Sequence, residues 1–147
     1  MITAIASTPD LSLGSSTGQA EPIAIYFEPT IQRYFDTLNM GDFQATAALF
    51  AVNGALHPPF ESLVVGEAAI AAYLAQEAQG LKLYPRQINK RIAIENDLVQ
   101  VSVSGRVKTA WFGVNVAWKF VLNPAQEIVY VAIELLASLQ ELANLRR

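Results

Sequence analysis

Four strand-like segments follow Gly80, and they constrain the fold more than any other feature of the chain. β-branched and aromatic residues dominate these segments, and apolar residues recur at every second position, which is the period of a strand with one buried face. Short runs of turn-forming residues separate the segments, so consecutive strands are expected to pair antiparallel. The predicted strands cover residues 81–94, 98–109, 112–122 and 127–137.

The sequence before these strands has a mainly helical pattern. Apolar residues recur at helical spacing over residues 22–38, and Pro29 is expected to kink or split that helix. Asp42 is placed to cap a second helix that ends at residue 49 or 50. The stretches GALHPPF and LVVG then predict short extended segments, and EAAIAAYLAQEAQG predicts a third helix.

Helices that precede a run of antiparallel strands are typical of an α+β domain. A long curved antiparallel sheet packed against N-terminal helices makes a cone, whose mouth opens between the two layers. The 147 residues fit one domain, which we place at residues 22–147. Residues 1–21, rich in Ser, Thr and Gly, are interpreted as a flexible arm, and residues 138–147 as a short closing helix.

Strand alternation indicates which side chains face the interior of this cone. Trp118 shares the apolar face of its strand with Val116 and Phe120, while Lys119 has the opposite parity. Trp111 lies in a turn, where parity does not settle its direction. An interior wall of this kind predicts an apolar pocket.

The composition excludes several classes of function. The chain is 52% hydrophobic, yet no apolar run reaches the about 18 residues of a membrane helix. A net charge of −3 argues against a nucleic-acid partner. With no cysteine and a single histidine, the chain lacks thiolate chemistry and a Cys- or His-based metal site, so we expect no metal. No Lys or Arg precedes residue 33, so a secretory signal is not supported and we expect a cytoplasmic protein.

Several longer stretches of the sequence resemble one family. IQRYFDTLNMGDF, LFAVNGALHPPFESLVVG, SGRVKTAWFGVNVAWKF and VLNPAQEIVYVAIELLAS are similar to the C-terminal domains of cyanobacterial orange carotenoid proteins and to stand-alone homologues of that domain, members of the nuclear-transport-factor-2-like superfamily. The resemblance covers residues 22–147 and implies the cone-shaped fold of that superfamily. It also implies a non-enzymatic function, in which carotenoid is taken up from membranes, passed transiently to helical carotenoid proteins and used to quench singlet oxygen.

The resemblance assigns roles to individual residues. Through RYFDTLN and VAWKF it implies that Tyr34 and Trp118 donate hydrogen bonds to the keto oxygen of a carotenoid such as canthaxanthin or echinenone, shared in a homodimer. Phenol and indole suit this role, because each combines one donor with an apolar ring. Without cysteine, disulfide-linked dimers are excluded. The expected tunnel lining is Leu38, Leu81, Leu83, Val107, Thr109, Trp111, Phe112, Val116, Phe120 and Ile133.

Two alternatives to carotenoid binding stay open at this point. The same cone fold hosts isomerases, dehydratases and epoxide hydrolases, so a small enzyme of the isomerase or dehydratase type that uses His57 or Glu134 is the main alternative. His57 is favoured as a turn residue beside two prolines, and Glu134 can point either to the pocket or to the outer face of the sheet. The other alternative is a dimerisation module without ligand.

Overall fold

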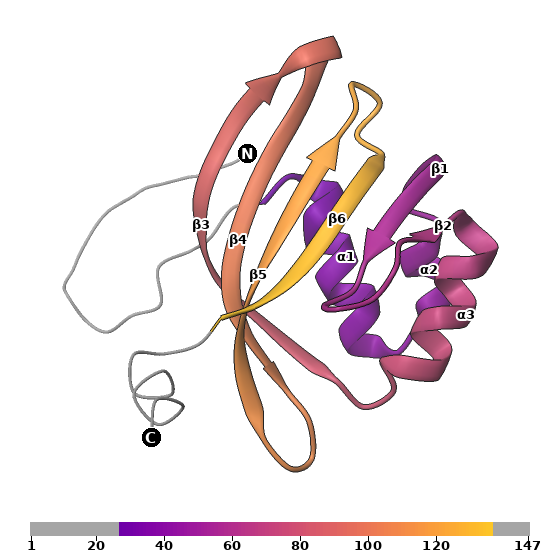
Figure 1. Cartoon of the computed structure of the whole chain (residues 1–147), viewed down its shortest axis with the longest axis vertical. Helices are drawn as coiled ribbons and strands as arrows, with labels where there is room; N and C mark the ends of the chain where they lie inside the picture. The colour runs from indigo at the N-terminus through magenta and orange to yellow at the C-terminus, as the bar shows by residue number, and fades with distance from the viewer. Residues whose placement is uncertain (1–26, 137–147) are drawn as a thin grey trace, which may run out of the picture.

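A curved six-stranded sheet organises the described part of the chain, residues 27–136, in the computed structural model (Figure 1). The strand order is β2-β1-β6-β5-β4-β3, and the helices gather against one side of the sheet. The predicted arm and closing helix lie outside the described residues. The elements are α1 (Pro29–Met40), α2 (Phe43–Ala47), β1 (Phe50–His57), β2 (Val64–Val65), α3 (Glu67–Glu77), β3 (Lys82–Ile94), the short 3₁₀ turn Glu95–Asp97, β4 (Leu98–Lys108), β5 (Gly113–Leu122) and β6 (Ile128–Leu136).

Strands β3 to β6 form the antiparallel meander that the alternating pattern predicts. Trp118 lies opposite Val103 of β4 and Ile133 of β6. Every second residue of β5 from Val116 onward is buried, so the predicted inward parity of Trp118 is confirmed. The α+β fold expected from the sequence is therefore confirmed.

Strand β1 corrects the predicted path of the second helix. We expected that helix to run to residue 49 or 50, but α2 ends at Ala47 and β1 begins at Phe50. β1 pairs in parallel with β6, from Phe50 opposite Ile128 to His57 opposite Ala132, with a bulge between. This pairing buries Phe50 and joins segments distant in the sequence, which local periodicity does not reveal.

The first helix also begins in a different place. We expected Pro29 to interrupt a helix, but it is the first helical residue of α1, where a missing N–H costs nothing because the first helical N–H groups have no partner in any case. Gly41 ends α1 in a left-handed conformation with φ of 77°. The predicted cap of the second helix is confirmed, since the Asp42 carboxylate accepts the backbone N–H of Ala45 at 3.2 Å.

An aromatic cluster joins α1 to the inner face of the meander. Tyr34 and Phe35 of α1 pack against Trp118 and Phe120 of β5, with ring centroids 5.0 Å apart for Tyr34 and Phe120 and 4.8 Å for Phe35 and Trp118. Both contacts are edge-to-face, the arrangement that aromatic quadrupoles favour. The cluster fills one end of the space between helices and sheet and leaves the other end open as a pocket.

Candidate functional site

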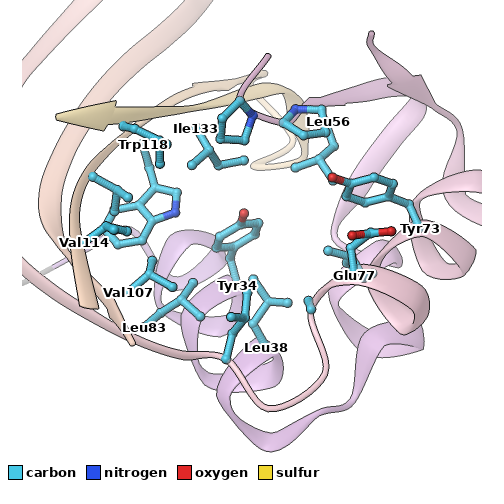
Figure 2. A pocket seen from close by; sticks show the side chains of 17 residues that line it. Tyr34, Leu38, Leu56, Tyr73, Glu77, Leu83, Val107, Val114, Trp118 and Ile133 are labelled. Carbon is cyan, nitrogen blue, oxygen red and sulfur yellow. The ribbon is translucent and has the colours of Figure 1, made fainter. Parts of the chain in front are cut away.

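An apolar pocket of about 210 Å³ lies between helices α1 and α3 and the concave side of the sheet (Figure 2). α1 and α3 supply one side of its wall, and β3 to β6 supply the other. Because the surrounding side chains are mostly aliphatic or aromatic, the pocket favours an apolar ligand. The wall consists of Tyr34, Leu38, Leu56, Pro58, Pro59, Tyr73, Leu74, Glu77, Ala78, Leu81, Leu83, Val107, Val114, Val116, Trp118, Ile133 and Leu135.

Tyr34 brings a phenol hydroxyl to this wall from the middle of α1. Only 2% of its surface is exposed, and its ring packs edge-on against Phe35 and Phe120. Burial raises the pKa of the Tyr34 phenol well above its ordinary value. The hydroxyl therefore keeps its proton throughout the physiological pH range and is available as a hydrogen-bond donor.

Trp118 brings an indole N–H to the same cavity from β5. Its side chain is 1% exposed, and Figure 2 shows its nitrogen and the Tyr34 hydroxyl both facing the cavity. Among residues 27–136, neither group has a hydrogen-bond partner. Buried polar groups in proteins are nearly always paired, so two donors directed at one apolar cavity indicate a ligand with a matching acceptor.

A third polar group in the wall differs from these two. Tyr73 of α3 lies across the cavity from Trp118, beside Glu77 (Figure 2). Partial burial and the negative charges of the Glu61 and Glu77 carboxylates together raise the pKa of Tyr73 to about 12. The Tyr73 hydroxyl thus differs from the other two donors, because it lies in the field of two carboxylates.

The structure places most of the predicted lining residues in the pocket wall. Besides Tyr34 and Trp118, these are Leu38, Leu81, Leu83, Val107, Val116 and Ile133. Their role toward a ligand stays a prediction. Sequence reasoning missed the contributions of α3, of the end of β1 and of the segment that follows it, including Leu56, Pro58, Pro59, Tyr73 and Leu74. Of these residues, Pro58 and Pro59 were noted in the sequence as the double proline of HPPF, but only as part of a turn.

Four expected lining residues lie elsewhere. Phe120 is fully buried behind Tyr34 and Phe35, so it belongs to the aromatic cluster. Trp111 and Phe112 are 88% and 62% exposed on the hairpin between β4 and β5. Thr109 closes this hairpin, since its hydroxyl accepts the backbone N–H groups of Trp111 at 3.0 Å and Phe112 at 3.1 Å. The turn geometry thus directs this segment away from the cavity.

The two candidate catalytic residues also lie outside the pocket. His57 and Glu134 line an adjoining hollow of about 310 Å³, which shares Pro58, Pro59, Ile133 and Leu135 with the pocket wall. The Nδ1 atom of His57 is 2.9 Å from the Tyr130 hydroxyl, and Glu134 is exposed with its carboxylate 4.0 Å from the Lys119 ammonium. Of the two directions left open for Glu134, the structure shows the outer face of the sheet.

Two further features bear on the kind of site. Within the described ranges, no group of three or more His, Cys, Asp or Glu side chains is arranged to hold a metal ion. No helix in residues 27–136 is long and apolar enough to cross a membrane.

Orange carotenoid-binding proteins are similar to this chain in sequence. The chain is 43% identical over 121 residues to an orange carotenoid-binding protein of Limnospira maxima and 43% identical over 122 residues to one of Synechocystis. These matches cover 79% and 80% of this chain but 38% of each relative, so the chain spans well under half the length of the curated relatives it matches.

Solved structures show the same relationship. The orange carotenoid protein of Anabaena, solved with canthaxanthin, superposes with a TM-score of 0.73 at 37% identity, over 88% of this chain and 44% of that one. The corresponding protein of Fremyella diplosiphon gives 0.72 at 41% identity, over 85% and 41%. A ketosteroid isomerase-like protein of Erwinia carotovora, at 15% identity and a TM-score of 0.56 over 74% and 92%, shares the fold alone.

The family match agrees with these relatives. The nuclear transport factor 2 (NTF2) domain matches residues 28–137, which is most of the chain and includes every described strand and helix. The part of the orange carotenoid proteins that it resembles is their C-terminal domain. The chain belongs to the NTF2 domain family and is a homologue of the C-terminal domain of orange carotenoid proteins.

Proposed function

We propose that this chain is a cytoplasmic carotenoid-binding protein whose pocket takes one end ring of a keto-carotenoid such as canthaxanthin or echinenone. The observation that carries the proposal is a pair of donors directed at one apolar cavity, the Tyr34 hydroxyl and the Trp118 indole N–H, neither of which has a partner among residues 27–136 (Figure 2). A keto oxygen has two lone pairs and accepts both bonds. The relationship to orange carotenoid-binding proteins supports this class of ligand.

Affinity and selectivity come from different parts of the site. Burial of the apolar ring and chain supplies the main driving force, at about 25 cal/mol per Å² of apolar surface removed from water. Each neutral hydrogen bond adds only about 1 kcal/mol net. However, a hydrocarbon ring leaves both donors without an acceptor, and this penalty makes the site select keto-carotenoids.

The size of the pocket limits how much of the pigment one protomer covers. At about 210 Å³ it exceeds the about 150 Å³ apolar cavity that admits benzene, and so suits one substituted ring. The polyene must then leave through the mouth, where Leu135 is 47% exposed. We propose a homodimer in which a second protomer covers the other end of a symmetric pigment.

The proposed role is handling of carotenoid without chemical conversion. The protein takes pigment from membranes, passes it to helical carotenoid proteins and quenches singlet oxygen while the pigment is bound. The pocket wall supports a non-enzymatic function, because the only carboxylate in the described wall is Glu77, which is exposed, and His57 and Glu134 lie outside it. General acid–base catalysis requires titratable groups that reach the reacting atom.

Co-expression with defined pigments tests the proposal. The chain is produced in one host that makes canthaxanthin and in a matched host that makes only β-carotene, and the purified proteins are compared by visible absorption and pigment-to-protein ratio. We expect a red-shifted carotenoid band from the first host and at least tenfold less pigment from the second. Colourless protein from both hosts would overturn the proposal, and equal loading would remove the keto selectivity.

A further inference from the structure

Asn39 joins the last turn of α1 to the beginning of β3. Its side-chain Nδ2 donates to the Leu83 carbonyl at 2.9 Å, and its Oδ1 accepts the Leu83 N–H at 2.7 Å. In addition, the Lys82 ammonium donates to the Asn39 backbone carbonyl at 3.0 Å. Three hydrogen bonds therefore converge on one residue at the contact between this helix and this strand.

The position of Leu83 in the sheet explains why the side chain of Asn39 can bond to both of its backbone groups. β3 is an edge strand, and Leu83 lies opposite Val107 in an antiparallel ladder. In such a ladder, the N–H and C=O of one residue face the same neighbour. Both groups of Leu83 bond to Asn39, so they face the open edge, and the amide of Asn39 substitutes there for a missing strand.

The two hydrogen bonds between the Asn39 amide and Leu83 form a clamp, and the elements that this clamp joins carry residues of the pocket wall. Leu83 lines the pocket from β3, while Tyr34 and Leu38 line it from α1 (Figure 2). The Tyr34 hydroxyl has no hydrogen-bond partner among the described residues, so the placement of α1 determines where it lies. The Asn39 amide thus fixes the separation between the two walls that would hold a ligand ring.

We propose that Asn39 is a positioning residue for pigment binding. It is absent from the pocket wall and acts through Tyr34 and Leu83, by holding α1 against β3 at the separation that an end ring requires. This inference rests on the proposed function, since its consequence is the geometry of the bound pigment. It identifies a determinant of pigment affinity and colour outside the cavity.

Three variants test the inference. Asn39→Asp keeps the acceptor for the Leu83 N–H but places an anionic oxygen against the Leu83 carbonyl, and Asn39→Leu removes both bonds. Met40→Ala is the matched control, because Met40 lies in the same turn, is 75% exposed and is absent from the pocket wall. We expect canthaxanthin affinity to fall about fivefold or more in both Asn39 variants, with a shifted absorption maximum, and neither change in Met40→Ala. If Asn39→Leu does not fold, Asn39→Asp decides the matter.

A second measurement separates positioning from a general loss of stability. In a Tyr34→Phe background, Asn39→Asp should cause little further band shift, because the hydroxyl that it misplaces is gone. Equal band shifts in both backgrounds, or unchanged band and affinity in the Asn39 variants, would overturn the positioning role.

Amide hydrogen exchange at Leu83 in the pigment-free protein distinguishes a failure of the positioning role from a failure of the proposed function. Faster exchange in Asn39→Leu together with a wild type that takes up no pigment counts against the proposed function, and the positioning role falls with it. Unchanged exchange at Leu83 in Asn39→Leu overturns the clamp itself.

Discussion

Replacement of Tyr34 by phenylalanine should have opposite effects on the empty and the loaded protein. The substitution removes one hydroxyl and keeps a ring that packs against Phe35 and Phe120 with centroids 5.3 and 5.0 Å away. Because that hydroxyl has no partner among residues 27–136, its removal breaks no hydrogen bond within this part of the chain. We therefore expect the pigment-free variant to unfold at the same temperature as wild type, or at a higher one.

Pigment binding should change in the other direction. A buried acceptor that loses its donor costs about 1–3 kcal/mol, which corresponds to a rise of about 5- to 150-fold in Kd for a keto-carotenoid. The absorption band should also move to the blue, because one hydrogen bond to the conjugated keto group is lost. Affinity for β-carotene should rise or stay level, since one unpaired donor has been removed from the cavity.

The assay combines thermal unfolding of the pigment-free protein with titration by canthaxanthin followed by visible absorption. Tyr130→Phe is the matched control, because the Tyr130 hydroxyl is bonded to His57 at 2.9 Å and Tyr130 lies outside the pocket wall. The control should lose about 0.5–1.5 kcal/mol of stability and keep its band position. The reasoning is refuted if Tyr34→Phe destabilises the empty protein by more than the control does and leaves canthaxanthin affinity unchanged.

Three further predictions follow from other residues. Trp118→Phe should weaken canthaxanthin binding by about 1–3 kcal/mol with a blue shift, measured as above; an unchanged spectrum would remove Trp118 as a donor. Trp111→Phe should leave the band nearly at its wild-type position, because Trp111 is 88% exposed outside the wall, and a shift as large as that of Trp118→Phe would contradict this. Burial, the largest single effect, would raise the pKa of Glu28, but the hydrogen bond from Arg91 at 2.9 Å, a backbone hydrogen bond and the charge of Arg91 together outweigh it, and the pKa is lowered. The stability that this pair provides is thus present above the ordinary pKa of 4.5 and is lost as the pH falls below it, so denaturation curves of wild type and Arg91→Met should converge in acid and differ at neutral pH.

Residue periodicity was sufficient for the meander and its inward face, because each strand there pairs with its neighbour in the sequence. The same periodicity placed Trp118 in the interior, where the structure has it. The donor role of Tyr34 came instead from resemblance, since a single tyrosine on an apolar helix face is equally suited to a core. Its burial and its direction toward a cavity are properties of the folded chain.

The errors have different physical origins. Pro29 is compatible both with a kink inside a helix and with the first turn of a helix, and periodicity alone does not show where the helix begins. Trp111 and Phe112 are apolar and were assigned to the tunnel, but the Thr109 hydroxyl bonds their backbone in a turn that carries them outward. The wall residues from α3 were missed because apolar residues are spread around this helix, so its sequence does not show which face meets the sheet.

The parallel pair of β1 and β6 also has a consequence for how the chain folds. Phe50 and Ile128 are neighbours in the sheet but about 80 residues apart in the sequence. Closure of so long a loop loses conformational entropy before favourable contacts form, so non-local pairings of this kind slow folding. On the ribosome, β1, β2 and the helices that cover them are made long before β6, so the sheet stays incomplete until this last strand emerges. A chain truncated before β6 would leave the facing edges of β5 and β1 unpaired, and we expect it to aggregate rather than to persist as a smaller domain.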